Sequence, residues 1–371
     1  MKQRQTLFLL TFAFLISSIA ISAQLQKQQD FSKREKRPLL TNAALKDTSL
    51  WDCTTQETYE IIQNDQFPFR DAFVSSKSLI DQLLGNRKID DVYLGNQMLL
   101  QDYPTFTNKQ QKELANAINA FQGKYPHLHM QMMLVPNAIA IHPQWLPNGA
   151  PSNQQLADLK AFTKQLNIDS INLIKPFKES KEALYYRSDH HWTSAAAKLA
   201  FDTFAYDNAL DTSQNTYKQL PVTNDFYGTL ASKTGIYRYP DEIIVYQNEN
   251  PDDVYRITYS DDNQTAYSMY DLASLESESA YNLFLKGNHP MIRIETASTR
   301  RNHLLVIKDS YANAFLPFLT PYYSSITVID PRYFYDSLET VLTQQQISDV
   351  LFLYNMNTFV TDTALKETLN S

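Results

Sequence analysis

Apolar residues follow two spacings along the chain, one typical of helices and one typical of buried strands. Apolar positions three or four residues apart predict two helices within residues 57–84, divided at Pro68, and further helices at residues 109–124, 153–166 and 195–206. Short apolar runs predict strands at residues 92–94, 98–100, 128–135, 170–174, 304–307, 326–329 and 350–353. A helix separates the strands at 128–135 and 170–174, so the sheet is most simply parallel. The pattern predicts an α/β fold.

The segment from about residue 210 to 301 has a different pattern. Runs at residues 243–246, 255–259 and 292–294 are typical of strands and lie among turns rich in Asp, Asn and Ser. They predict a β-rich insertion or lobe that could form the floor of a substrate groove. Its many tyrosines are expected mainly to pack, although aromatic faces also stack against sugars.

An uncharged and mostly apolar stretch, residues 5–24, follows Lys2 and Arg4. Its length lies between that of a signal peptide and the ~20 apolar residues of a spanning helix, so residues 1–24 are predicted to be a signal peptide or an N-terminal membrane anchor. A buried helix is the third interpretation. The polar residues 25–54 predict a linker, and residues 55–371 a single domain. That domain is expected to be exported and either secreted or associated with the cell envelope, where residues 5–24 could tether it.

Composition narrows the classes of function. The chain has 371 residues, of which 43% are hydrophobic and 12% aromatic, enough to fill a large core. Its net charge is −7 and no stripe of Lys and Arg runs through it, so we do not expect nucleic-acid binding. Cys53 is its only cysteine, which excludes an intramolecular disulfide and a multi-cysteine metal site. Neither a cofactor nor a metal is expected.

Two short motifs carry the candidate chemistry. Asp189 and His191 supply an acid and a base two positions apart, after the predicted 170–174 strand. Ser310 follows the predicted 304–307 strand and precedes a predicted helix over residues 311–319, where a nucleophile would sit. A serine hydroxyl needs an imidazole to take its proton, and the imidazole needs a carboxylate to orient it. The two motifs therefore predict a serine hydrolase or acyltransferase.

Polar groups at the ends of the later strands are candidates for binding the oxyanion or the substrate. Ser310 offers its own N–H and the helix dipole, and Asn355 or Asn357 could supply a side-chain donor. Arg332 could hold the oxyanion or an anionic group of the substrate, or could pair with a neighbouring carboxylate. If the strands are parallel, these groups converge at one edge of the sheet.

Three further residues complete the expected set at oxyanion or substrate-binding positions: Tyr311, His190 and Asn288. His190 also fits a supporting loop residue, and Asn288 fits a capped turn equally well. The adjacent histidines could instead form a surface pair or bind a metal with Asp189. Adjacent ligands seldom point the same way, however, and no H-x-x-x-H spacing supports a metal.

The sequence from Ser188 to Thr193, SDHHWT, resembles the defining motif of the DHHW proteins, which belong with the AlgJ/AlgX-type SGNH-like proteins that O-acetylate extracellular polysaccharides. Segments at residues 64–70, 133–137, 287–290 and 306–313 also resemble that family, so the resemblance covers roughly residues 55–360. It implies a three-layer SGNH-like, flavodoxin-like parallel sheet.

The resemblance also implies roles for single residues. Asp189 would be the orienting acid, His191 the base, Ser310 the nucleophile and Asn355 the oxyanion asparagine. The usual order, with the serine first, would be circularly permuted. Two features depart from the pattern: Lys308 stands where a glycine is usual, and no glycine follows the 326–329 strand. Arg332 could compensate for the second.

Three classes of function remain open. The first is an exported acetyl-transfer enzyme acting on a polysaccharide, or an esterase if water is the acceptor. A transferase would need an acetyl donor, delivered by a separate membrane protein because this chain has no further apolar spans. The second is a noncatalytic carbohydrate-binding or assembly protein on the same scaffold. The third is a metal site at Asp189, His190 and His191.

Overall fold

The computed structural model describes residues 2–32, 37–47, 53–151, 153–277 and 279–371. The chain divides into two compact units, the smaller formed by Met1–Ile89 with Ser232–Ile236 and the larger by Asp90–Ala231 with Tyr237–Ser371. Residues 55–89, which the sequence analysis includes in the domain, lie in the smaller unit.

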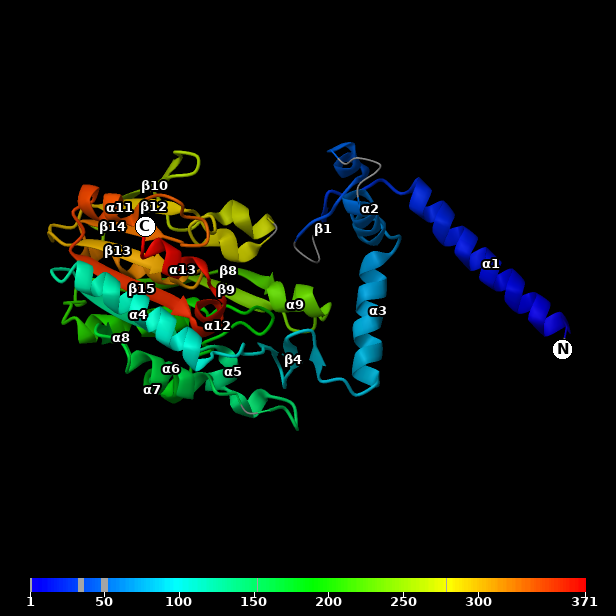
Figure 1. Cartoon of the computed structure of the whole chain (residues 1–371), viewed down its shortest axis with the longest axis horizontal. Coiled ribbons are helices and arrows are strands. Elements are labelled where there is room, and N and C mark those ends of the chain that lie inside the picture. Colours follow the sequence, from blue (N-terminus) through cyan, green and yellow to red (C-terminus); the bar gives the residue numbers. More distant parts are fainter. Residues whose placement is uncertain (1, 33–36, 48–52, 152, 278) are drawn as a thin grey trace. The chain divides into compact units, whose positions relative to one another are not determined.

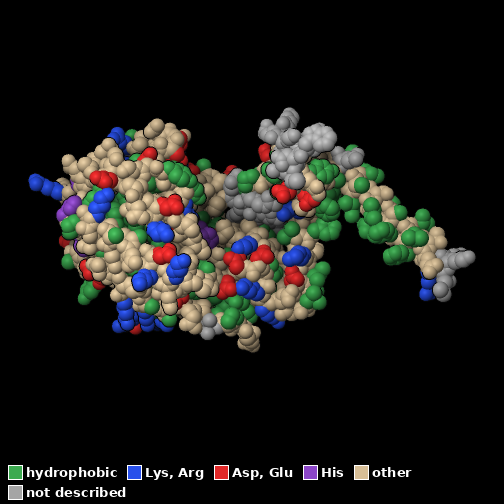
Figure 2. All heavy atoms as spheres, viewed as in Figure 1, with side chains coloured by type: hydrophobic (Ala, Val, Ile, Leu, Met, Phe, Trp, Pro, Cys, Tyr) green, Lys and Arg blue, Asp and Glu red, His purple; other side chains and the backbone are tan. Residues whose placement is uncertain are grey.

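The smaller unit contains mainly helices (Figure 1). Its elements are α1 (Lys2–Leu25), β1 (Phe31–Ser32), β2 (Arg37–Pro38), η1 (Asn42–Asp47), α2 (Cys53–Asp65), α3 (Arg70–Leu83) and β3 (Lys88–Ile89). The predicted division of residues 57–84 into two helices is confirmed. In α1, the segment Arg4–Ala23 has a mean hydropathy of 2.1 and is long and apolar enough to cross a membrane. Figure 2 shows apolar side chains along the visible face of α1, which also fits a signal peptide.

The larger unit is built on an eight-stranded mixed sheet with the strand order β11-β10-β12-β14-β13-β15-β6-β7. Its strands are β6 (His129–Val135), β7 (Asp169–Ser170), β10 (Tyr255–Tyr259), β11 (Thr265–Ala266), β12 (Met291–Thr296), β13 (His303–Lys308), β14 (Ser325–Ile329) and β15 (Asp349–Asn355). The five strands from β14 to β7 are parallel, as predicted. Strands β12, β10 and β11 extend the sheet antiparallel. Two hairpins lie outside this sheet: β4 (Val92–Leu94) with β5 (Leu99–Gln101), and β8 (Tyr217–Phe226) with β9 (Asp241–Asn248).

Helices pack on both faces of the sheet (Figure 1). The α-helices of this unit are α4 (Asn108–Lys124), α5 (Ala138–Ile141), α6 (Gln155–Thr163), α7 (Ile174–Glu179), α8 (Ser194–Asp207), α10 (Ala312–Phe315), α11 (Leu338–Gln344), α12 (Met356–Thr361) and α13 (Ala364–Thr368). The residues of α9 (Thr229–Thr234) are divided between the two units after Ala231. Alternate residues of β15 point to opposite faces: Leu351 and Leu353 join a core with α8, whereas Val350 and Phe352 join a core with α4.

Three predictions about the larger unit need correction. The predicted 170–174 strand is only the two-residue β7, because α7 begins at Ile174; Pro176 is its third residue, where its missing N–H costs nothing. The predicted 311–319 helix is the four-residue α10 followed by the 3₁₀ turns η5 (Leu316–Phe318) and η6 (Thr320–Tyr322), each with a proline in its first turn. Finally, β10 to β12 belong to the central sheet, so residues 210–301 are not a separate lobe.

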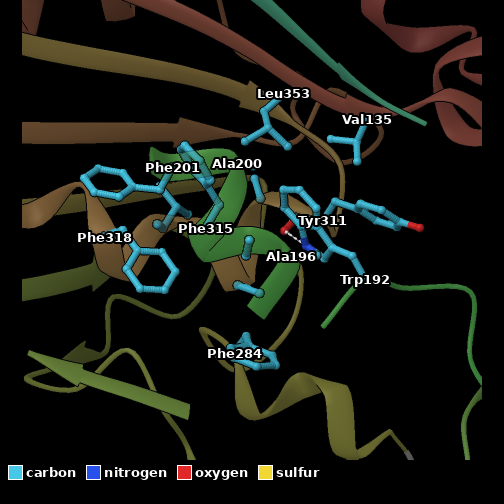
Figure 3. Close-up of a cluster of buried hydrophobic side chains, with 14 of the residues drawn as sticks. Val135, Trp192, Ala196, Ala200, Phe201, Phe284, Tyr311, Phe315, Phe318 and Leu353 are labelled. Atoms are coloured by element: carbon cyan, nitrogen blue, oxygen red, sulfur yellow. Dashed lines mark hydrogen bonds between the residues drawn. The ribbon is translucent and has the colours of Figure 1, made fainter. Parts of the chain in front are cut away.

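The core beneath the two candidate motifs is largely aromatic (Figure 3). Trp192 is fully buried and its Nε1 donates a hydrogen bond to the Tyr311 carbonyl at 2.9 Å. Figure 3 shows both residues beside Phe315 and the small residues Ala196 and Ala200 of α8. This packing joins the loop that carries Asp189 to the turn that carries Ser310.

Candidate active site

The parallel strands bring three polar side chains together at one edge of the sheet. Asp309 follows β13, Asn137 follows β6, and Asn355 ends β15, which lies between them. The Asp309 carboxylate accepts hydrogen bonds from the Asn355 N–H at 2.8 Å and its side-chain amide at 2.6 Å. Asn137 donates to the Asn355 side-chain oxygen at 3.1 Å. The predicted convergence of the later strand ends is therefore confirmed for β13 and β15, and Asn137 after β6 joins them.

Burial raises the pKa of Asp309 to about 6, although hydrogen bonds from the Tyr311 and Asn355 amides oppose the rise. The carboxylate holds the turn after β13 in place, because it also accepts the Tyr311 N–H at 2.9 Å. This turn presents Ser310, the next residue, at the strand edge.

Asp189, His191 and Ser310 form a continuous hydrogen-bonded series. His191 Nε2 lies 2.8 Å from Ser310 Oγ, and His191 Nδ1 lies 2.5 Å from Asp189 Oδ1. An ionised carboxylate only accepts, so Nδ1 carries the ring proton and Nε2 is free to accept from the serine hydroxyl. Asp189 and His191 are only 3% and 6% exposed. The arrangement can move a proton from Ser310 to His191.

Asp189 is held by the first residue of α9, Thr229, and by the preceding Gly228. Its Oδ2 accepts hydrogen bonds from the Thr229 N–H at 2.6 Å and the Thr229 hydroxyl at 3.0 Å. Gly228 passes so close that a methyl group there would lie 2.1 Å from Asp189 Cβ and Oδ2, so the position requires a residue without Cβ. Burial alone would raise the pKa of Asp189, but the charges of His191 and His190 and the hydrogen bonds from His191 and Thr229 lower it overall.

The start of the motif is anchored separately by Asp241. Its carboxylate accepts the backbone N–H groups of Arg187 and Ser188, each at 2.8 Å, and the Ser188 hydroxyl. This buried carboxylate therefore fixes the backbone just before Asp189.

Aromatic rings fix the orientation of His191. The Tyr281 ring stacks on the imidazole with centroids 3.6 Å apart and planes 10° from parallel. Tyr281 is 3% exposed. Tyr311 lies beside the same imidazole and donates its hydroxyl to the His190 carbonyl. Tyr311 thus supports the motif from within the core, whereas His190 contacts Thr229 through Nδ1 at 2.6 Å.

The expected oxyanion donors are only partly available. In the described part of the chain, the Ser310 N–H has no protein acceptor. The Asn355 side-chain amide, by contrast, donates to Asp309 and to the Thr358 hydroxyl, so both its N–H groups are used. Asn357 donates its side-chain amide to the Asp102 carbonyl. In this structure the Asn355 amide supports the turn after β13, and its role as an oxyanion donor stays a prediction. The helix dipole is also reduced, since α10 has four residues.

Arg332 and Asn288 lie in a second polar cluster at the ends of β13 and β14. The Arg332 guanidinium donates two hydrogen bonds to the buried Asp330 carboxylate, at 2.8 and 2.6 Å, so Arg332 pairs with a neighbouring carboxylate, one of the two roles considered for it. The Lys308 ammonium lies 3.3 Å from Asp330 and donates to the Asn288 side-chain oxygen at 2.7 Å. Lys308 at the position of the usual glycine thus points into this cluster.

Asp189, His190 and His191 place three potential ligand atoms within 4.8 Å of one another. Both ring nitrogens of His191 are already in hydrogen bonds, to Asp189 and Ser310. A metal at this cluster would have to break at least one of them, and the donor set fits proton transfer better than metal binding.

Sequence reasoning missed several residues that build the site. Tyr281, Thr229, Gly228 and Asp241 lie in a region predicted only as β-rich. The one local signal is that Gly228 and Thr229 interrupt a strand-like run, a common mark of a close backbone approach. Asn137 was noted only as part of the 133–137 segment.

The sequence pattern that defines the DHHW protein family matches residues 89–329. No protein with a curated description matches the chain. Among solved structures, a DHHW family protein from Eubacterium siraeum is 24% identical with a TM-score of 0.61, covering 76% of this chain and 97% of its own. Bacillus cereus PatB1, solved with a sulfonyl adduct, is 19% identical with a TM-score of 0.63, and the match covers 74% of this chain and 97% of PatB1. The O-acetyltransferase domain of Pseudomonas putida AlgJ is 15% identical with a TM-score of 0.47, covering 75% and 98%. The Eubacterium siraeum protein and PatB1 share the fold of this chain. The family pattern matches residues 89–329, well over half of the chain, which shows that the chain belongs to the DHHW protein family.

Proposed function

We propose that the chain is an exported serine-dependent O-acetyltransferase or acetylesterase acting on a cell-surface or extracellular polysaccharide. The observation that carries this proposal is the buried series from Asp189 through His191 to Ser310, with 2.8 Å between the imidazole Nε2 and the serine Oγ. A reactive serine next to a correctly protonated imidazole is the arrangement that acyl transfer requires.

The proposed reaction has two steps. Ser310 Oγ attacks the acetyl carbonyl carbon while its proton passes to His191 Nε2, and the Asp189 carboxylate stabilises the resulting imidazolium. The Ser310 N–H can donate to the oxyanion, and His191 returns the proton to the leaving group as its bond to the acetyl carbon breaks. A sugar hydroxyl or water then gives its proton to His191 and attacks the acetyl-serine. Collapse of this second intermediate transfers the acetyl group and restores the serine hydroxyl.

The remaining inferences come from the family resemblance. We infer that the order of Asp189 and His191 before Ser310 reflects circular permutation of an SGNH-like fold, and that residues 210–301 are an insertion into it. The α1 helix would direct export as a signal peptide or tether the domain to the membrane, with residues 25–54 as the linker. A membrane-bound protein would supply the acetyl group if the enzyme is a transferase.

Intact mass spectrometry after incubation with p-nitrophenyl acetate, with release of p-nitrophenol followed in parallel, tests the acyl-enzyme. Wild-type protein is expected to gain one acetyl group or to turn the ester over, and Ser310→Ala to do neither. PatB1 was solved with a sulfonyl adduct, so phenylmethylsulfonyl fluoride is a second probe, expected to add one sulfonyl group at Ser310. Absence of acetyl adduct, sulfonyl adduct and turnover from wild type would favour the noncatalytic carbohydrate-binding alternative. Adding an oligosaccharide separates transferase from esterase by whether the sugar gains the acetyl group.

Tyr281→Leu is expected to slow acyl-enzyme formation by about 3- to 30-fold, because the stacked ring orients His191 and its π-face stabilises the imidazolium. Tyr281→Phe should retain most of the activity, since it keeps the ring and removes a hydroxyl that lacks a partner in the described residues. Stopped-flow measurement of p-nitrophenol release gives both rates. Equal rates of acyl-enzyme formation for Tyr281→Leu and Tyr281→Phe would show that the Tyr281 ring only packs against His191.

A further inference from the structure

A cavity of about 560 Å³ lies against the β8–β9 hairpin and β10, in the larger unit. Its volume is within the range of about 300–1,000 Å³ that small-ligand sites occupy. None of the residues that line it belongs to the Asp189–His191–Ser310 series. It is therefore a second concave site on the same unit.

Four tyrosines line the cavity: Tyr246, Tyr255, Tyr267 and Tyr270. Three of them are fixed by their surroundings. Tyr270 donates its hydroxyl to the Tyr246 carbonyl at 2.7 Å, the Tyr246 ring packs edge-on against Phe318, and the Tyr255 hydroxyl accepts the Met269 N–H. Such rings offer rigid faces at little cost in conformational entropy.

The rim of the cavity is open and apolar. Tyr267 is 74% exposed, and the neighbouring Val254 and Leu272 are 60% and 59% exposed. The Tyr267 ring stacks on no other ring in the described residues, so one of its faces can receive a ligand. Exposed apolar groups gathered at a concave surface are typical of binding sites.

The polar lining favours an uncharged ligand. The cavity has a single charged residue, Asp253, and no Lys or Arg among its described lining residues. Its described lining therefore offers no cation that could pair with an anionic polymer. The Gln247 side-chain amide, which has no hydrogen-bond partner in the described part of the chain, can bind hydroxyl or acetamido groups. Aromatic faces combined with amide groups are suited to the C–H faces and hydroxyls of neutral sugar rings.

We propose that this cavity binds a neutral glycan segment, built of uncharged hexose or N-acetylhexosamine units. A chain of ring contacts relates it to the candidate active site: His191 stacks on Tyr281, Tyr281 contacts Phe284, and Phe284 contacts Tyr270 in the cavity wall. Tyr281 and Phe284 are only 3% and 1% exposed, so this contact chain runs through the core and joins the cavity wall to the packing around His191. That the bound glycan is the acetyl acceptor rests on the proposed function, whereas the binding itself does not.

Isothermal titration calorimetry with three tetrasaccharides tests the proposal: cellotetraose, tetra-N-acetylchitotetraose and an alginate tetrasaccharide. At least one of the two neutral sugars is expected to bind, and the anionic alginate sugar to bind at least tenfold more weakly. Tyr267→Ala should weaken binding about tenfold, since it removes the exposed stacking ring. Tyr206→Ala is the matched control, because Tyr206 is 86% exposed and lies on α8 away from the cavity lining.

The outcomes separate this proposal from the proposed function. Binding that is retained by Ser310→Ala and weakened by Tyr267→Ala supports the glycan site, whether or not an acyl-enzyme forms. Lack of binding to both neutral sugars, preference for the alginate sugar, or equal affinities of wild type and Tyr267→Ala would each overturn it. Failure of acyl-enzyme formation with glycan binding intact would count against only the enzymatic proposal.

Discussion

Asp189→Asn is expected to lower the rate of acyl-enzyme formation by about 10⁴-fold while leaving the fold in place. In the wild type, Oδ1 accepts the Nδ1 proton of His191, which leaves Nε2 as the acceptor for Ser310. An asparagine amide turned toward His191 would donate to Nδ1 and move the ring proton to Nε2, so the imidazole could no longer accept the serine proton. In the opposite orientation the asparagine NH₂ would face the Thr229 N–H, so two donors would meet without an acceptor.

The measurement is stopped-flow release of p-nitrophenol, with thermal unfolding as the check on folding. Asp225→Asn is the matched control: it makes the same chemical change on an exposed side chain of β8 and should keep the wild-type rate. A rate for Asp189→Asn within tenfold of wild type, in a folded protein, would show that Asp189 does not set the tautomer of His191.

The parts of the site on the sheet edge could be predicted because they depend on local patterns. Asp309, Asn137 and Asn355 each stand at the end of a strand whose apolar run is visible in the sequence, and parallel strands bring their ends together. The position of Ser310 follows from the same reasoning. The antiparallel extension by β10 to β12 could not be predicted in the same way, because the sequence of a single strand does not show which other strand it pairs with.

The residues that orient His191 and Asp189 could not be found from local patterns. Tyr281 and Gly228 act through contacts with residues far away in sequence: Tyr281 stacks on His191, and Gly228 leaves no room for a Cβ beside Asp189. Asn355 shows the same dependence on distant residues. Its position at the end of a strand could be predicted, but the acceptors of its amide, Asp309 and the Thr358 hydroxyl, are seen only in the structure. Sequence patterns thus indicated the proposed reacting groups, but not the residues that orient them.

Asp330→Ala is expected to lower the free energy of unfolding by about 3–5 kcal/mol, because it removes the counterion of a fully buried cation. Lys308 and Asp330 are both 0% exposed, and the Lys308 ammonium has only the Asn288 side chain and Asp330 as hydrogen-bond partners in the described residues. Arg332 would lose its carboxylate as well. Asp336→Ala, on an exposed carboxylate of the same connection, should change stability by less than about 0.5 kcal/mol.

The pH dependence distinguishes an unpaired ammonium from a simple loss of packing. Burial already lowers the pKa of Lys308 and Asp330 opposes that effect, so removing Asp330 should lower the pKa of Lys308 further. The unfolded lysine then binds more protons than the folded one, and stability rises with pH between the two pKa values. Urea unfolding from pH 7 to pH 10 should therefore show the deficit of Asp330→Ala shrinking as pH rises. A deficit that stays constant over this range would mean that packing and not charge accounts for the loss, and a deficit below about 1 kcal/mol at pH 7 would contradict the buried ion pair itself.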